Sequence, residues 1–107
     1  MDIEKLAENL GLEKEDFTEL FELYVQTTSS DLEGLRAALN SGESEEVHKK
    51  SHSIKGSSGN LALKELYELA REIDDRARAD MLDGLEDRVR VFGERFEELV
   101  GEFKRGG

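Results

Sequence analysis

Apolar residues recur three or four positions apart along most of this chain, and this spacing is the feature that most limits its fold. The spacing places them on one face of an α-helix. No window alternates with the period of two that is typical of a strand, and the chain contains no proline to interrupt a helix. The sequence therefore predicts an all-α protein. The longest stripe comprises Phe17, Leu20, Phe21, Tyr24, Thr28, Leu32, Leu35 and Leu39.

Turn residues divide the pattern into a short N-terminal helix and four longer ones. The first helix is expected to end at Gly11, and residues 40–42 end the second. Ser44 is the expected N-cap of the third helix, which residues 59–60 end, and Asp80 is the expected N-cap of the fifth. The remaining stripes are Ile3, Leu6 and Leu10 in the first helix, Leu63, Leu66, Leu69, Ala70, Ile73 and Ala77 in the fourth, and Leu85, Val89, Phe92, Phe96, Leu99 and Phe103 in the fifth.

Short links between long amphipathic helices favour antiparallel neighbours. We therefore expect an antiparallel up-down four-helix bundle with a short N-terminal cap helix. A chain of 107 residues is the length of one domain, so residues 1–107 are expected to form a single helical bundle domain.

The composition excludes several classes of function. With 26 acidic residues against 15 Lys and Arg, the net charge of −11 argues against binding to nucleic acid or to anionic membrane surfaces. The absence of cysteine excludes disulfides, thiol nucleophiles and cysteine-type zinc sites. No membrane-length apolar run and no secretory leader pattern is present, so the cytoplasm is the expected compartment. No cofactor is expected.

The segment 47–64 departs from this acidic background. It contains no Asp or Glu, although the average density of the chain would place about four acids there. It holds four lysines, a group of small residues and both histidines of the chain, His48 and His52. This composition favours positive charge, an imidazole and a bare backbone at one place on the surface.

A helical wheel separates the third helix into an inner and an outer side. His52 falls on the outer side with His48, Lys55 and Gly56 as its neighbours one turn away. We therefore expect His52 to be exposed. The inward positions are Val47, Ser51, Ile54 and Ser58.

These residue types suit phosphoryl chemistry. A neutral imidazole has a free nitrogen lone pair and is a competent nucleophile toward phosphorus. Lys55 can neutralise phosphoryl oxygens, and Gly56 removes a side chain that would crowd the ring of His52. A glycine inside a helix costs about 1 kcal/mol relative to alanine. That cost is understandable if access to His52 matters more than helix stability, although early fraying before Gly59 would also explain Gly56.

The sequence His52-Ser-Ile-Lys-Gly-Ser-Ser-Gly-Asn-Leu61 closely resembles the motif of histidine-containing phosphotransfer (HPt) domains, H-x-[LI]-K-G-[SA]-[SA]-x-x-[LI]-G. The apolar helix LKELYELAREI follows at the spacing of that family, and the helical stripes fit an HPt bundle from about residue 12 to about residue 104. The chain departs from the motif at Ala62, where a glycine is usual.

The resemblance implies roles for individual residues. His52 would be the phosphoacceptor through Nε2, Lys55 would assist the phosphoryl group, and Gly56 would provide clearance. Asp74 stands where the family often has a Gln or Glu that holds Nδ1–H of the ring. An aspartate could do the same. Its shorter side chain leaves open an indirect contact, or a solvated helix charge beside Asp75.

The function implied is that of a phosphorelay carrier in two-component signal transduction. It would exchange a phosphoryl group between His52 and an aspartate of a response-regulator receiver domain, with a receiver or a histidine kinase as partner. The chain would not be an enzyme by itself, because no nucleotide-binding loop is evident. Two alternatives remain: the phosphotransfer module of a multidomain, chemotaxis-type histidine kinase, or a non-catalytic helical adaptor.

A docking surface is expected around His52, on a protein that needs no dimer to work. His48 and His52 form an i, i+4 pair of the kind that can bind metal, but the surrounding lysines disfavour a dication, so no metal is expected. His48 is more simply a residue at the rim of the interface. The partner-binding candidates are His48, Ser51, Gly59, Arg71, Asp75 and Arg78, with Thr27, Thr28 and Asp31 as weaker ones.

Overall fold

The computed structural model describes residues 2–106, and all of its regular structure is helical. The structure therefore confirms the all-α class. Its five helices are α1 (Ile3–Asn9), α2 (Lys14–Asn40), α3 (Ser44–Asn60), α4 (Lys64–Arg78) and α5 (Leu85–Gly106).

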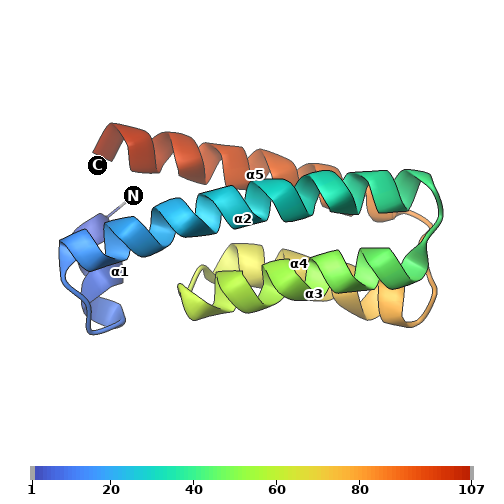
Figure 1. The fold of residues 1–107 in the computed structure, drawn as a ribbon, viewed down its shortest axis with the longest axis horizontal. Coiled ribbons are helices and arrows are strands. Elements are labelled where there is room, and N and C mark those ends of the chain that lie inside the picture. The colour runs from blue at the N-terminus through green and yellow to red at the C-terminus, as the bar shows by residue number, and fades with distance from the viewer. Residues whose placement is uncertain (1, 107) are drawn as a thin grey trace.

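The four long helices lie beside one another along the long axis of the molecule (Figure 1). Helices α2 and α5 run side by side, α3 and α4 run next to them, and each long helix reverses the direction of the one before it. The most extensive helix contact joins α3 to α4, and α1 packs against α2 near the two chain ends. The α3–α4 contact matters most for function, because it brings the acid-free segment against the following helix.

The predicted apolar stripes form the core. Phe17, Phe21 and Phe92 are among the largest fully buried side chains, and ring stacking between Phe21 and Phe103 joins α2 to α5. The prediction for Leu20 is wrong, because 43% of this residue is exposed at the surface of α2. On α3 the prediction is confirmed, since the buried residues are Val47, Ser51, Ile54 and Ser58.

Two predicted helix caps are wrong. Ser44 is the first residue of α3, and Glu43 occupies the N-cap position without a side-chain hydrogen bond. Asp80 does not begin α5 but terminates α4: its φ is +58°, and its backbone N–H donates to the carbonyl of Ala77. Asp and Asn tolerate this left-handed conformation better than most residues, which explains an aspartate at a helix end instead of a helix start.

The turn between α3 and α4 also depends on a left-handed residue. Helix α3 continues through Asn60, and the chain reverses at Ala62, whose φ is +56°. The backbone N–H of Leu63 then donates to the carbonyl of Ser58 and closes the turn. The departure from the HPt motif at Ala62 therefore falls where glycine would adopt the backbone conformation without steric cost.

Within residues 2–106, no helix combines the length and the apolar character that crossing a membrane requires.

Candidate functional site

A buried carboxylate on α4 is the centre of the candidate site. The side chain of Asp74 is 0% exposed and lies against α3. It meets three residues of α3 that recur at helical spacing, His48, His52 and Lys55. The structure thus brings Asp74, His52 and Lys55 together as expected, and its burial excludes the alternative that Asp74 is a solvated helix charge.

The two carboxylate oxygens of Asp74 have different partners. Oδ1 is in close contact with Nδ1 of His48. Oδ2 lies 3.1 Å from Nζ of Lys55 and 3.4 Å from Nδ1 of His52, a long distance for a hydrogen bond. The contact between Asp74 and the ring of His52 is therefore direct but loose, while His48 and Lys55 hold the carboxylate more firmly.

The environment keeps Asp74 ionised. Burial by itself raises the pKa of a carboxyl group. Hydrogen bonds from Lys55, His48 and His52 act in the opposite direction and together hold the pKa of Asp74 below its usual value. A buried carboxylate that carries its charge needs such partners, because an unpaired buried charge is strongly unfavourable.

An ionised carboxylate also determines which ring nitrogens carry hydrogen. Because a carboxylate only accepts hydrogen bonds, Nδ1 of His52 must donate to Asp74, and the same holds for His48. In a neutral imidazole the other nitrogen, Nε2, then keeps its lone pair. The site therefore presents His52 in the tautomer that a nucleophile at Nε2 requires.

Exposure differs sharply among these residues. The side chain of His52 is 61% exposed, that of His48 33% and that of Lys55 20%. The expectation that His52 projects into solvent is confirmed. Lys55 is half-buried, with its ammonium group turned to Asp74 beside the histidine ring.

The two glycines of α3 have different surroundings. A Cβ added to Gly56 would meet nothing within 4 Å, whereas one added to Gly59 would lie 3.1 Å from Cδ1 of Tyr67. The close approach of Tyr67 therefore explains why a residue without a side chain stands at position 59. No internal contact in the described part of the chain accounts for Gly56, which leaves bare helix backbone open to solvent one turn after His52.

The partner-binding candidates divide into exposed and buried residues. Arg71 and Asp75 are exposed on α4 and paired with each other at 3.5 Å, and Arg78 is exposed one turn further on. Ser51 is a wrong candidate, because its side chain is buried and its hydroxyl donates to the carbonyl of Val47. Its position on the inward face of α3 already indicated this.

The weaker candidates on α2 divide in the same way. Thr28 is fully buried and is wrong as a docking residue. Thr27 is exposed, with its hydroxyl bonded to the carbonyl of Leu23. Asp31 is partly buried and accepts a hydrogen bond of 2.7 Å from the hydroxyl of Ser53, which links α2 to the helix that carries His52.

Sequence reasoning missed the contact between His48 and Asp74. His48 was assigned to the interface rim, but it lies one turn before His52 and faces the same carboxylate. The spacing of His48, His52 and Lys55 by four and three residues was the available signal, since it places all three on one side of α3.

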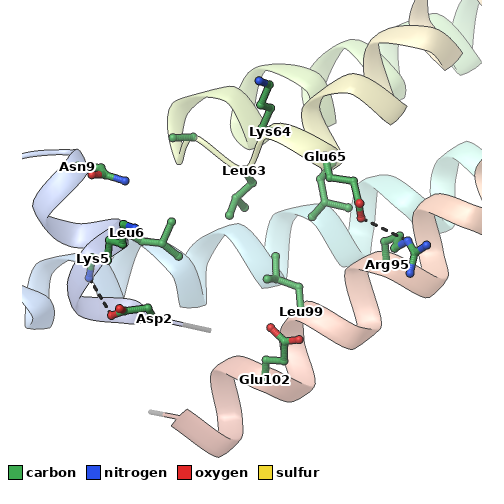
Figure 2. Close-up of a pocket in the computed structure, with 12 residues that line it drawn as sticks. Asp2, Lys5, Leu6, Asn9, Leu63, Lys64, Glu65, Arg95, Leu99 and Glu102 are labelled. Carbon is green, nitrogen blue, oxygen red and sulfur yellow. Dashed lines mark hydrogen bonds and ion pairs between the residues drawn. The ribbon is translucent and has the colours of Figure 1, made fainter.

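No three His, Asp or Glu side chains in the described range 2–106 lie so that they could hold a metal ion. A groove of about 400 Å³ lies elsewhere and is formed by α1, the start of α4 and α5 (Figure 2). Leu6, Leu63 and Leu99 line its apolar part, and an ion pair between Glu65 and Arg95 lies at its edge. Its lining residues do not include His48, His52 or Lys55, the residues that bond to Asp74.

Comparison with known proteins gives a family. A family model for the Hpt domain matches residues 19–105, and no curated protein matches the chain. The fold is similar to that in the crystal structure of histidine-containing phosphotransfer protein B (HptB) from Pseudomonas aeruginosa PAO1, with a TM-score of 0.86 and 24% identity over 94% of this chain and 88% of that one. The chain belongs to the Hpt domain family, and its role is that of a phosphorelay carrier in two-component signalling.

Proposed function

We propose that His52 is the phosphoacceptor of this carrier and that Nε2 is the atom that forms the bond to phosphorus. The observation that carries the proposal is the pairing of an exposed imidazole with a buried, ionised carboxylate on its Nδ1 side. This pairing leaves Nε2 with a lone pair and directs it away from Asp74.

The proposed reaction is an in-line transfer between His52 and a receiver aspartate. The lone pair of Nε2 attacks phosphorus, the bond from phosphorus to the aspartyl oxygen breaks, and the receiver carboxylate leaves with that electron pair. The ring keeps its hydrogen on Nδ1 and gains positive charge, which the carboxylate of Asp74 stabilises. Transfer in the opposite direction reverses these bond changes.

Lys55 and Gly56 would assist at different stages. The ammonium group of Lys55 lies beside the ring and can neutralise phosphoryl oxygens while sharing Asp74. The open space over Gly56 supports close approach of a receiver domain to the helix backbone. A Cβ at that position would meet nothing within 4 Å in this chain, so it would obstruct a docking partner and not the bundle itself.

We further propose that the partner surface lies on the exposed sides of α3 and α4 around His52. Its members would be His48 and Gly59 from α3 and Arg71, Asp75 and Arg78 from α4. Their exposure supports this assignment for the α4 residues. The partners would be a receiver domain, a histidine kinase, or both.

The same proposal covers the architecture and setting of the chain. We assign α2–α5 as an antiparallel up-down four-helix bundle with α1 as its cap, in one domain over residues 1–107. The reversal of successive helices in Figure 1 supports this arrangement. The carrier would act as a cytoplasmic monomer and would depend on its partners for chemistry, without an ATP site of its own.

A labelling experiment tests the function. Receiver domains are phosphorylated with radioactive acetyl phosphate, purified and mixed with the wild-type chain, with His52→Gln and with Lys49→Ala. We expect acid-labile label on the wild type and on Lys49→Ala, whose side chain points to solvent and pairs with Glu46. Label on His52→Gln equal to that on the wild type would refute the proposal, and receiver binding that never yields phosphohistidine would identify an adaptor.

A further inference from the structure

The carboxylate of Asp74 has a third partner whose role the proposed chemistry does not require. Nδ1 of His48 makes the close contact to Oδ1, while His52 and Lys55 share Oδ2. We propose that His48 is a positioning residue for phosphoryl transfer: it fixes the rotation of the Asp74 carboxylate so that Oδ2 faces Lys55 and the ring of His52. This inference rests on the proposed function of His52.

The geometry gives His48 the firmer hold on the carboxylate. A carboxylate on a short side chain can rotate about its last bond, and this rotation changes which oxygen faces which neighbour. The His52 contact is 3.4 Å and that ring is largely exposed, so His52 restrains the rotation weakly. His48 is more buried than His52, and its ring contacts the opposite oxygen.

The environment leaves few other groups to perform this task. The charged or titratable side chains that bond to Asp74 within residues 2–106 are His48, His52 and Lys55, all on α3. On α4 itself, Arg71 and Asp75 pair on the exposed side. If His48 is removed, we expect water to reach Oδ1 and the carboxylate to turn.

His48 is poorly suited to be a second phosphoacceptor, although its Nδ1 is held in the same way. The ring of His52 lies one turn after it, with ring centroids 5.7 Å apart, and no glycine opens the helix on that side. His52, by contrast, is followed by Gly56 one turn later. The structure therefore assigns the two histidines different roles at one carboxylate.

Three substitutions separate positioning from packing. His48→Ala removes the contact. His48→Asn retains an amide nitrogen at the same number of bonds from the backbone as Nδ1, so it can still donate to Oδ1. His48→Gln places its amide one bond further out and serves as a matched polar control. Urea unfolding of each variant shows that it is folded, and Lys49→Ala serves as a control on the same helix.

The first measurement needs no partner protein. Long-range proton–nitrogen NMR of the ¹⁵N-labelled chain, above the pH range in which imidazole titrates, reports which ring nitrogen of His52 carries hydrogen. We expect mostly Nδ1–H in the wild type and in His48→Asn. We expect a shift toward Nε2–H in His48→Ala and His48→Gln. An unchanged population in His48→Ala overturns the proposal.

The second measurement is the initial rate of phosphoryl transfer from a phosphorylated receiver domain. Mutation of a residue that orients a reacting group through another side chain typically lowers activity about tenfold or more. We therefore expect the transfer rate of His48→Ala to fall about tenfold. We expect His48→Asn to retain most of the wild-type transfer rate and His48→Gln to retain less of it. A faster reaction in His48→Ala would overturn positioning and show that His48 competes with His52 for Asp74.

The two proposals fail in distinguishable ways. If His52→Gln accepts label as well as the wild type, the assignment of the phosphoacceptor is wrong. If His52→Gln is inactive but His48→Ala matches the wild type in rate and tautomer, only the positioning role is wrong.

Discussion

The ammonium group of Lys55 lies 3.1 Å from a carboxylate oxygen of Asp74, and the side chain of Asp74 has no exposed surface. This ion pair ties α3 to α4 directly beneath the exposed ring of His52. The contact that stabilises the helix pair is thus also the contact that places a cation and a carboxylate beside the proposed phosphoacceptor.

Replacing Asp74 by Asn should weaken both the fold and the reaction. The substitution keeps the size of the side chain but leaves Lys55 without its charged partner. Because Lys55 can still reach solvent, we expect a loss of about 1–3 kcal/mol in the free energy of unfolding, measured with urea. Phosphoryl acceptance should fall by about tenfold. Glu97→Gln, which removes an exposed charge on α5 outside the proposed site, is the control and should change neither quantity appreciably.

The stabilising effect of Asp74 should depend on pH. Its pKa in the folded chain is lowered, because the hydrogen bonds from Lys55, His48 and His52 outweigh the effect of burial. A carboxyl group with a lowered folded pKa contributes stability above its unfolded pKa of about 3.9, and this contribution disappears as the pH falls through the folded value. The difference in unfolding free energy between the wild type and Asp74→Asn should therefore be largest near neutrality and shrink in acid. A constant difference from neutral to strongly acidic pH would contradict the assignment.

Gly56→Ala should separate stability from function. Alanine is favoured over glycine inside a helix by about 1 kcal/mol, and the added Cβ has open space around it. We expect the variant to unfold at higher urea concentration while accepting phosphoryl groups from a receiver domain more slowly. A larger residue, as in Gly56→Leu, should slow transfer further. Gly59→Ala is the contrasting control, because its Cβ would press on the ring of Tyr67 and offset the gain in helix propensity.

Ala62→Gly should stabilise the chain without changing its chemistry. Ala62 has a φ of +56°, a left-handed conformation that is unfavourable for a residue with a Cβ. Allowing for the greater flexibility of glycine in the unfolded chain, we expect a gain of about 0.5–1 kcal/mol in urea unfolding. Ala79→Gly, at a helix end with a φ of −86°, should give no such gain. If both variants destabilise equally, the turn geometry is different from that described.

Tyr24→Phe should remove a buried hydrogen bond between α2 and α3. The hydroxyl of Tyr24 lies 2.8 Å from that of Ser58, and removing one partner of such a pair typically costs about 1–2 kcal/mol. Burial also raises the pKa of Tyr24, against a smaller opposing effect of the hydrogen bond with Ser58. A raised folded pKa means that this stability is complete below the unfolded pKa of about 10 and declines as the pH rises above it. The difference in unfolding free energy between the wild type and Tyr24→Phe should therefore become smaller in urea titrations at alkaline pH.

Much of the fold was predictable because helical periodicity records burial directly. The stripe of α3 was predicted from spacing, and Val47, Ile54 and Ser58 are buried as expected. The caps were less predictable. Ser44 and Asp80 are residue types that favour helix starts, but backbone conformation at the neighbouring turns decided where each helix begins.

The candidate site was predictable only in part. The helical wheel of the third helix indicated an exposed His52 ring with Lys55 and Gly56 beside it, and both the exposure and the open space are present. The roles of these residues stay predictions. The contact of His48 with Asp74 was not predicted, since the sequence of one helix does not show which side chain of the next helix a residue will meet.

Local sequence was sufficient to determine the helical class, the inward faces and the outward projection of His52. These features follow from the geometry of a single helix, in which successive residues are rotated by about 100°. Only the tertiary structure decided that Asp74 is buried and that His48, His52 and Lys55 share its two oxygens. The physical reason is that the rotation and height of α4 against α3 depend on how the whole core packs. A displacement of about one residue, 1.5 Å along a helix, would be enough to change the partners of that carboxylate.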